Sequence, residues 1–359
     1  MKSSFTVLSF VAAVLIFAAS CKKSSTAPSY TVPTTYNFSN ANFADATTRL
    51  GMYTEMSTIE KGAITGTISA TALKNEFTNT GAPFITATYN TSGIQIANQG
   101  AAAYQTDVPN WIDSLVKVSA SPNVASRGVA GVGTSSASLT TKYALSATGV
   151  NYAQVFNKGT MVGLCTYQIV STMVNVTNGS LDNTTVVNGE TAMEHAWDLA
   201  FGYWGVPIDF PTNKTGVKLW GSYSTQVDSG FKANKTLMDA FLKGRAAISA
   251  KDNATFVAQA NLIIITMEKL NAAAALQEVN EIKASISDNV ARNSRLSECY
   301  GFIYSMKYNP KRTLMTDAQV NAALALFPKN FWDLTLTDIN NIEAAIAVPY
   351  GFVSVQDIL

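Results

Sequence analysis

The chain contains a single histidine, His195, and an aspartate follows it three residues later in the segment 190–207, ETAMEHAWDLAFGYWGVP. If this segment is helical, His195 and Asp198 lie on the same side, because an α-helix repeats every 3.6 residues. An imidazole and a carboxylate at that spacing can reach one metal ion or one polar ligand. Gly202 continues this side, and glycine inside a helix costs about 1 kcal/mol unless a close approach requires it. We therefore expect His195 and Asp198 to face a shared cleft that contains Gly202.

The other side of the same segment is apolar and is expected to face the core. It consists of Met193, Ala196, Trp197, Ala200 and Trp204. Two plainer interpretations of the polar side stay open, namely a histidine that makes structural hydrogen bonds and an ordinary solvated helix face. A metal site requires more ligands than one helical turn supplies.

Carboxylates on other apolar helical segments are the candidates for the missing ligands: Glu55, Glu60 and Glu298. A carboxylate in apolar surroundings needs a partner, because an unpaired buried charge costs several kcal/mol. For Glu298 that partner is either a metal ion or a nearby arginine, such as Arg295 or Arg49. The predicted metal site consists of His195, Asp198, Glu298 and Glu55, with zinc or iron as the candidate metals.

The first 21 residues, MKSSFTVLSFVAAVLIFAASC, have the pattern of a secretory signal. Lys2 precedes an apolar stretch that is shorter than the roughly 20 residues of a membrane-spanning helix. Small residues directly before Cys21 resemble the lipobox of bacterial lipoproteins, and the resemblance implies a signal peptide over 1–20 and acylation of Cys21 by chains such as palmitate. An ordinary cleaved signal with an incidental cysteine is the alternative.

The residues after Cys21 predict an anchored protein. Residues 21–35 are rich in Ser, Thr and Pro, which is typical of an extended tether. Acyl chains contribute about 0.8 kcal/mol per buried CH₂, so two or three of them hold a folded domain on a membrane. Lys22 stands where lipoproteins retained in the inner membrane have aspartate, so the resemblance points to the outer membrane, facing either the periplasm or the exterior.

The composition favours a globular body and excludes nucleic-acid binding. The chain is 47% apolar and has 25 Lys and Arg against 24 Asp and Glu. No basic cluster interleaved with aromatic residues occurs, so the charge pattern of a nucleic-acid interface is missing. Cys165 and Cys299 lie in apolar helical patterns, and we expect two separate buried thiols rather than a disulfide.

Apolar residues recur every three or four positions along most of the chain, and this spacing predicts an all-α protein built as one or two packed bundles of long helices over 36–359. Gly159 and Gly163, four residues apart, are expected to let a partner helix approach closely. Residues 119–150 are Gly- and Ser-rich and predict a long loop, either a lid or a connection between bundle halves. Strands are indicated only weakly, at 64–71 and 83–90. The expected helices cover 43–61, 97–118 with a kink at Pro109, 152–174, 237–249, 255–282 and 290–308.

Four segments together resemble a family of Bacteroidetes-type lipoproteins defined as domain of unknown function 4856. They are TYNFSNANFADATTRLGMYTEM, FNKGTMVGLCTYQIV, MEHAWDLAFGYWGVP and RLSECYGFIYSMKYNP. The sequence HAWDLAFGYWG is also similar, more distantly, to the GxHxxE signature of imelysin-like proteins. That resemblance implies a helical bundle, with His195 at the position of the histidine and Asp198 at that of the glutamate. Met193 stands where the signature has glycine.

Three functions are compatible with these features. The first is a lipid-anchored binding protein that holds a metal, haem or small ligand near His195 and works beside an outer-membrane transporter in iron uptake. The second is a metal-dependent peptidase of the imelysin type, with Glu194 or Glu298 as general base, which requires a third protein ligand from elsewhere in the chain. The third is a non-catalytic interaction protein of the cell surface.

Overall fold

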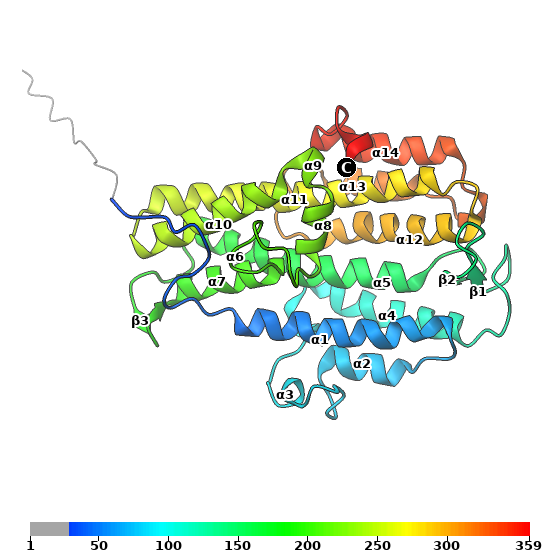
Figure 1. Cartoon of the computed structure of the whole chain (residues 1–359), viewed down its shortest axis with the longest axis horizontal. Helices are drawn as coiled ribbons and strands as arrows, with labels where there is room; N and C mark the ends of the chain where they lie inside the picture. Colours follow the sequence, from blue (N-terminus) through cyan, green and yellow to red (C-terminus); the bar gives the residue numbers. More distant parts are fainter. Residues whose placement is uncertain (1–28) are drawn as a thin grey trace, which may run out of the picture.

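The computed structural model describes residues 29–359, so the predicted signal peptide and Cys21 lie outside the described residues. Long helices run side by side along one axis and form an elongated bundle (Figure 1). The all-α prediction is confirmed. The long helices are α1 (Ala44–Lys61), α4 (Ala102–Ser119), α5 (Tyr152–Met161), α6 (Tyr167–Thr177), α7 (Ala192–Trp204), α10 (Ala233–Ser249), α11 (Asn253–Ala284), α12 (Asn289–Ser305) and α14 (Leu336–Tyr350).

Short elements connect these helices. They are α2 (Ala70–Thr78), α3 (Ala87–Asn90), α8 (Trp220–Gln226), α9 (Asp228–Phe231), α13 (Asp317–Ala325), and the 3₁₀ turns η1 (Gly62–Ile64), η2 (Ala97–Gln99), η4 (Met306–Tyr308), η5 (Phe331–Asp333) and η6 (Gln356–Ile358). Two small antiparallel sheets lie at opposite ends of the bundle (Figure 1), formed by β1 (Gly131–Thr134) with β2 (Lys142–Leu145) and by β3 (Val186–Val187) with β4 (Glu190–Thr191).

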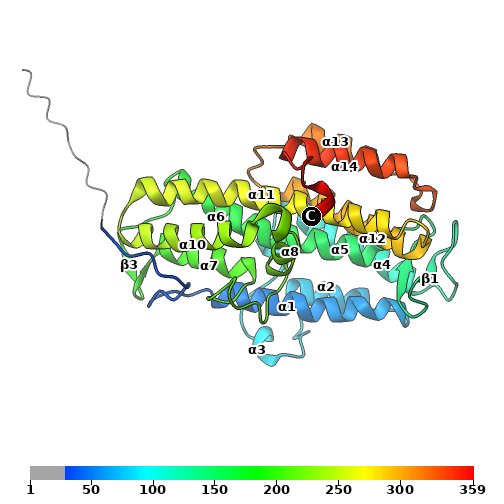
Figure 2. The same ribbon diagram turned by 45° about the horizontal axis from the view of Figure 1, so that its top comes forward.

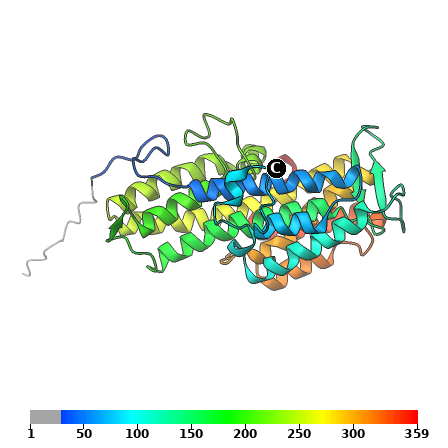
Figure 3. The same ribbon diagram turned by 90° about the horizontal axis from the view of Figure 1, so that it is seen from below.

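Helix α11 forms the centre of the bundle, where it packs against α10, α12, α6 and α14. Helix α14 packs on part of α11, and α13 packs on α12 and α14. Helices α1 and α2 lie on the opposite side of the molecule from α13 and α14 (Figure 2). Seen from below, the blue and cyan helices of the first 119 residues lie in front along much of the length (Figure 3). The core is one continuous apolar cluster, and the β1–β2 hairpin contributes Ala144 to it.

The helix predicted over 152–174 is one continuous rod, since α5 passes into α6 through a π-helical turn, η3 (Val162–Thr166). A methyl group added to Gly159 would collide with the Trp111 ring, and one added to Gly163 would collide with the Tyr104 ring. Both aromatic residues belong to α4. The prediction that these glycines admit a partner helix is confirmed.

Two local predictions are wrong. Segments 64–71 and 83–90 form no strands, and fold instead into η1, the start of α2 and α3. The predicted loop 119–150 contains the β1–β2 hairpin, in which Val132 lies opposite Ala144. This hairpin is fixed to the bundle because the Ser135 hydroxyl and the Ala137 N–H donate to Asp288 Oδ2, at 2.6 and 3.1 Å.

The two cysteines expected to be separate are both buried and free. Within residues 29–359, none of the helices is long and apolar enough to cross a membrane.

Candidate functional site

Helix α7, which carries His195, begins at a tight hairpin. Asn188 and Gly189 form the turn between β3 and β4 with φ values of 55° and 89°, a conformation that asparagine and glycine adopt most readily. The Thr191 hydroxyl then accepts a bond from the Glu194 N–H at 3.2 Å, and Glu194 Oε2 accepts from the Thr191 N–H at 2.8 Å. This capping box fixes the start of α7 directly after the hairpin, so His195 lies beside the strands.

Asp198 is fully buried and belongs to an ionic cluster. Its carboxylate accepts hydrogen bonds from the Tyr36 hydroxyl at 2.6 Å and from Arg245 Nε at 2.8 Å. Arg245 also donates to Glu194 Oε1 at 2.9 Å and to Asn40 Oδ1 at 2.9 Å. The pKa of Asp198 is above its ordinary value because burial raises it more than the Arg245 charge lowers it. Asp198 thus ties α7 to α10 and to the N-terminal segment.

Gly202 faces the start of α1. A Cβ atom at Gly202 would lie 2.8 Å from Phe43 Cβ and 2.9 Å from Ala46 Cβ, closer than such atoms approach. One residue earlier, the Phe201 ring stacks on Tyr36 with centroids 3.7 Å apart. The glycine therefore admits a neighbouring segment, as its cost in a helix suggested, but that segment is protein.

The cleft predicted to contain His195, Asp198 and Gly202 is consequently not formed. The N-terminal segment and α10 cover the side of α7 on which Asp198 and Gly202 lie, and only His195 remains half-exposed. The prediction of a shared cleft is wrong because a chain segment outside the helices folds back onto α7.

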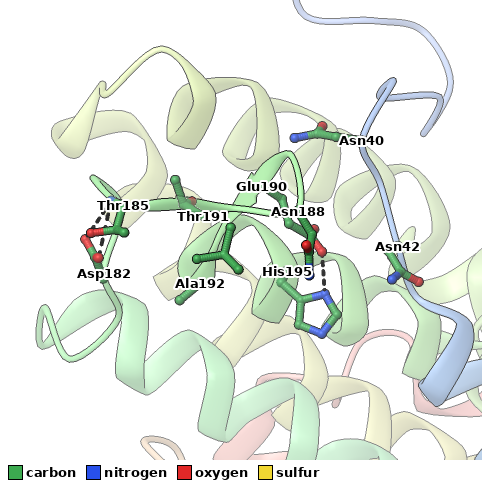
Figure 4. A pocket seen from close by; sticks show the side chains of 10 residues that line it. Asn40, Asn42, Asp182, Thr185, Asn188, Glu190, Thr191, Ala192 and His195 are labelled. Atoms are coloured by element: carbon green, nitrogen blue, oxygen red, sulfur yellow. Dashed lines mark hydrogen bonds and ion pairs between the residues drawn. The ribbon is translucent and has the colours of Figure 1, made fainter.

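His195 lines an open cavity of about 530 Å³ between the hairpin and the N-terminal segment (Figure 4). Its Nδ1 atom lies 2.9 Å from Glu190 Oε1, an ion-pair distance at which the two groups are not aligned for a hydrogen bond. Within residues 29–359 the buried Glu190 Oε2 has no hydrogen-bond partner. The polar lining also includes Asn40, Asn42, Asp182 and Asn188.

The other two predicted ligands have partners of their own. Glu55 accepts hydrogen bonds from the backbone N–H groups of Ile85 and Thr86, at 2.9 and 3.2 Å, at the start of α3. Glu298 accepts from Lys158 Nζ at 2.9 Å and from the Tyr223 hydroxyl at 2.7 Å.

The arginine alternative for Glu298 is correct in part. Arg295 lies 3.4 Å from Glu298, whereas Arg49 donates to the Tyr203 hydroxyl at 2.8 Å. Burial raises the pKa of Glu298, but Lys158, the Tyr223 hydroxyl and Arg295 together lower it by more, so this carboxylate is ionised and paired. The structure does not bring His195, Asp198, Glu298 and Glu55 together. Across residues 29–359, no group of three or more His, Cys, Asp or Glu side chains is placed to hold a metal ion.

Sequence reasoning missed Glu190 and the two asparagines of the N-terminal segment. The signal for Glu190 was present in VVNGET, since Asn-Gly between strand-forming residues is typical of a two-residue hairpin turn. A hairpin there returns the chain so that residue 190 lies next to the first turn of α7. Nothing in the spacing of Asn40 and Asn42 indicates a cavity wall.

Comparison with known proteins gives one result. No curated protein and no solved structure matches the chain significantly. The family described as "Domain of unknown function (DUF4856)" matches residues 33–353, which include every helix of the bundle. The chain therefore belongs to the DUF4856 family, as the resemblance of its motifs predicted.

Proposed function

We propose that this protein is a lipid-anchored binding protein of the outer membrane and that it holds a small polar, uncharged ligand in the cavity beside His195. The observation that carries the proposal is the cavity itself, in which Glu190 Oε2 is buried beside the imidazole and has no hydrogen-bond partner among residues 29–359. A buried carboxylate oxygen without a hydrogen bond is costly, and a ligand hydroxyl or amide N–H would satisfy it.

The groups that line the cavity suit hydroxyl-rich ligands. In the described part of the chain, three groups on the cavity wall make no hydrogen bond: His195 Nε2, Asn42 Nδ2 and the side-chain amide of Asn188. Donors and acceptors are therefore both available to a ligand. No lysine or arginine occurs among the described lining residues, so a strongly anionic ligand would meet the carboxylates of Glu190 and Asp182 without compensation. A volume of about 530 Å³ is within the usual range for small-molecule sites. A monosaccharide or disaccharide fits this chemistry.

The position of the cavity supports an anchored role. The N-terminal segment leaves the bundle at the end that carries β3 (Figure 1). The N-terminal segment is fixed to this end of the bundle by the Tyr30 hydroxyl, which donates to Asp252 Oδ2 at 3.1 Å. Seven residues lie between Cys21 and Ser29, and the eight steps from one Cα atom to the next, at about 3.5 Å each, reach about 28 Å at most. Acylation at Cys21 would therefore keep the cavity close to the membrane surface.

The anchor is tested by labelling cells with tagged palmitate. We expect the label on the wild-type protein and on Cys165→Ser, and its loss in Cys21→Ser, with the protein then leaving the outer-membrane fraction. Cys165 is the matched control because it is a cysteine in the core. Label on Cys21→Ser equal to wild type would exclude lipidation at this position.

The ligand is tested by calorimetric titration of the purified protein with a panel of monosaccharides and disaccharides and, separately, with zinc chloride. We expect sugar binding that weakens at least tenfold in His195→Ala and Glu190→Gln and is unchanged in Asp239→Asn, an exposed carboxylate on α10. Zinc binding lost in His195→Ala would favour the metal hypothesis instead. Sugar binding indifferent to both cavity variants, or no binding at all, contradicts the proposal.

A further inference from the structure

A second, smaller cavity of about 170 Å³ lies where the end of α1, strand β2 and the start of α5 meet. It shares no lining residue with the cavity beside His195. The groups that matter on its wall are Glu60, Lys61, Lys142, Tyr143, Gln154 and Asn157.

Glu60 is a buried acid that pairs with no cation in the part of the chain that the structure describes. It is 3% exposed, and Asn157 Nδ2 donates to its Oε2 at 2.7 Å. Within residues 29–359 it forms no ion pair and Oε1 has no hydrogen-bond partner, because the nearby Lys158 is paired with Glu298 at 2.9 Å. Burial raises the pKa of Glu60 to about 7. Such a carboxyl group is stabilised in its ionised form by any cation that reaches it.

The mouth of the same cavity is positively charged. Lys61 and Lys142 are exposed, and in the described part of the chain neither forms an ion pair. The Gln154 amide and the Tyr143 hydroxyl also line the space and make no side-chain hydrogen bond among residues 29–359. The cavity therefore has a negative interior, a positive rim and free polar groups between them.

We propose that this cavity binds a small zwitterion, an α-amino acid with a short side chain, whose ammonium group pairs with Glu60 and whose carboxylate is held by Lys61 and Lys142. A ligand with only a positive charge would meet two lysines at the rim, and a ligand with only a negative charge would meet Glu60 inside. A zwitterion satisfies both ends. The volume of about 170 Å³ is that of roughly six water molecules, so large side chains do not fit.

The test is a calorimetric titration of the purified full protein with glycine, alanine and serine, and with methylammonium and acetate as the two half-ligands. We expect at least one amino acid to bind and both half-ligands to bind at least tenfold more weakly. In Glu60→Gln, which keeps the shape and removes the charge, amino-acid affinity should fall at least tenfold. Glu76→Gln is the matched control, because Glu76 on α2 is equally buried, its pKa is also raised to about 7 by burial, and it lines neither cavity.

Several results would overturn the proposal. They are no amino-acid binding at millimolar concentration, equal affinity in Glu60→Gln and wild type, and methylammonium binding as tight as that of alanine. His195→Ala should leave amino-acid binding unchanged, so failure of this proposal is distinguishable from failure of the sugar site.

A measurement on the unaltered protein tests the role of Glu60 without any substitution. Because Glu60 is partly protonated near pH 7 and a bound ammonium group favours its ionised form, binding should release protons. Titrations in two buffers of different ionisation enthalpy measure this release. We expect the release to increase as the pH falls from 8 to 6, and binding without proton release across that range contradicts the role of Glu60.

Discussion

Replacement of Arg245 by methionine should destabilise the protein strongly, because it leaves two carboxylates buried without their cation. Arg245 is fully buried, and it lies 2.8 Å from Asp198 and 2.9 Å from Glu194. Methionine fills a similar length with apolar atoms but donates no hydrogen bond. The contacts between Arg245 and Asp198 are also the reason why Asp198 is not available to the predicted metal site.

The magnitude follows from the loss of one partner of a buried ion pair, which costs about 3–5 kcal/mol. An unfolding entropy of about 2 cal/mol/K per residue over roughly 330 residues gives about 0.7 kcal/mol/K, so a loss of 4 kcal/mol lowers Tm by about 6 °C. The deficit should depend on pH. Without Arg245, burial raises the pKa of both carboxyl groups above their unfolded values, so the native variant binds protons as the pH falls. The difference from wild type is therefore largest above pH 7 and shrinks toward pH 4.

Denaturant unfolding followed by circular dichroism at pH 7.5 and pH 4.5 measures both effects. Arg127→Met is the matched control, since Arg127 forms an exposed ion pair with Asp333, and exposed pairs contribute about 0–1 kcal/mol. A loss below about 1 kcal/mol for Arg245→Met, or a deficit that grows as the pH falls, would refute the assignment of Arg245 as the cation that stabilises this buried cluster.

Three further outcomes are expected. On an open helix face, Gly202→Ala would raise the free energy of unfolding by about 1 kcal/mol. Here it should lower the free energy of unfolding, measured in urea, by about 1–3 kcal/mol, because the added methyl group meets the start of α1. The free energy of unfolding of Glu60→Gln should exceed that of wild type by about 3 kcal/mol above pH 7 and equal it below pH 4.5. The reason is that the native pKa of Glu60 lies near 7 against an ordinary value of 4.5. Equal stability of the two proteins at pH 8 would contradict the burial of an unpaired charge at Glu60. Asp288→Ala should lower the free energy of unfolding by about 2–3 kcal/mol, because Asp288 caps α12 and accepts a hydrogen bond from the Ser135 hydroxyl of the hairpin. Amide hydrogen exchange in residues 131–145 should also accelerate in this variant.

Helical periodicity predicted the bundle because a long helix repeats one apolar face many times. The helices expected over 43–61 and 255–282 correspond to α1 and α11 within two residues at each end. No helix was expected after residue 308, although Thr316 with Gln319 and Thr335 with Asp338 form the capping boxes that start α13 and α14.

The site was harder to predict than the fold because its decisive contacts join distant parts of the chain. A helical wheel places Asp198 and Gly202 with His195, and it contains no information on which neighbour covers that side. The covering segment, residues 36–43, contains neither helix nor strand. Its aromatic content in YNFSNANF was a cue to burial, but the position where it packs depends on contacts more than 150 residues apart, such as that between Tyr36 and Asp198.

His195 lines the cavity directly, and Asp198 supports the opposite wall of the same cavity from behind. The N-terminal segment that supplies Asn40 and Asn42 to the cavity wall is held by the ionic cluster, because Arg245 donates to Asn40 Oδ1 at 2.9 Å and the Asn42 N–H donates to Asp198 Oδ2 at 3.3 Å. Loss of Arg245 removes the first bond and weakens the support of the second. In Arg245→Met the backbone amide of residue 42 should therefore exchange with solvent faster than in wild type, by more than the global loss of stability requires. Exchange that rises equally throughout the bundle would mean that the cluster stabilises the fold as a whole and does not specifically hold the cavity wall.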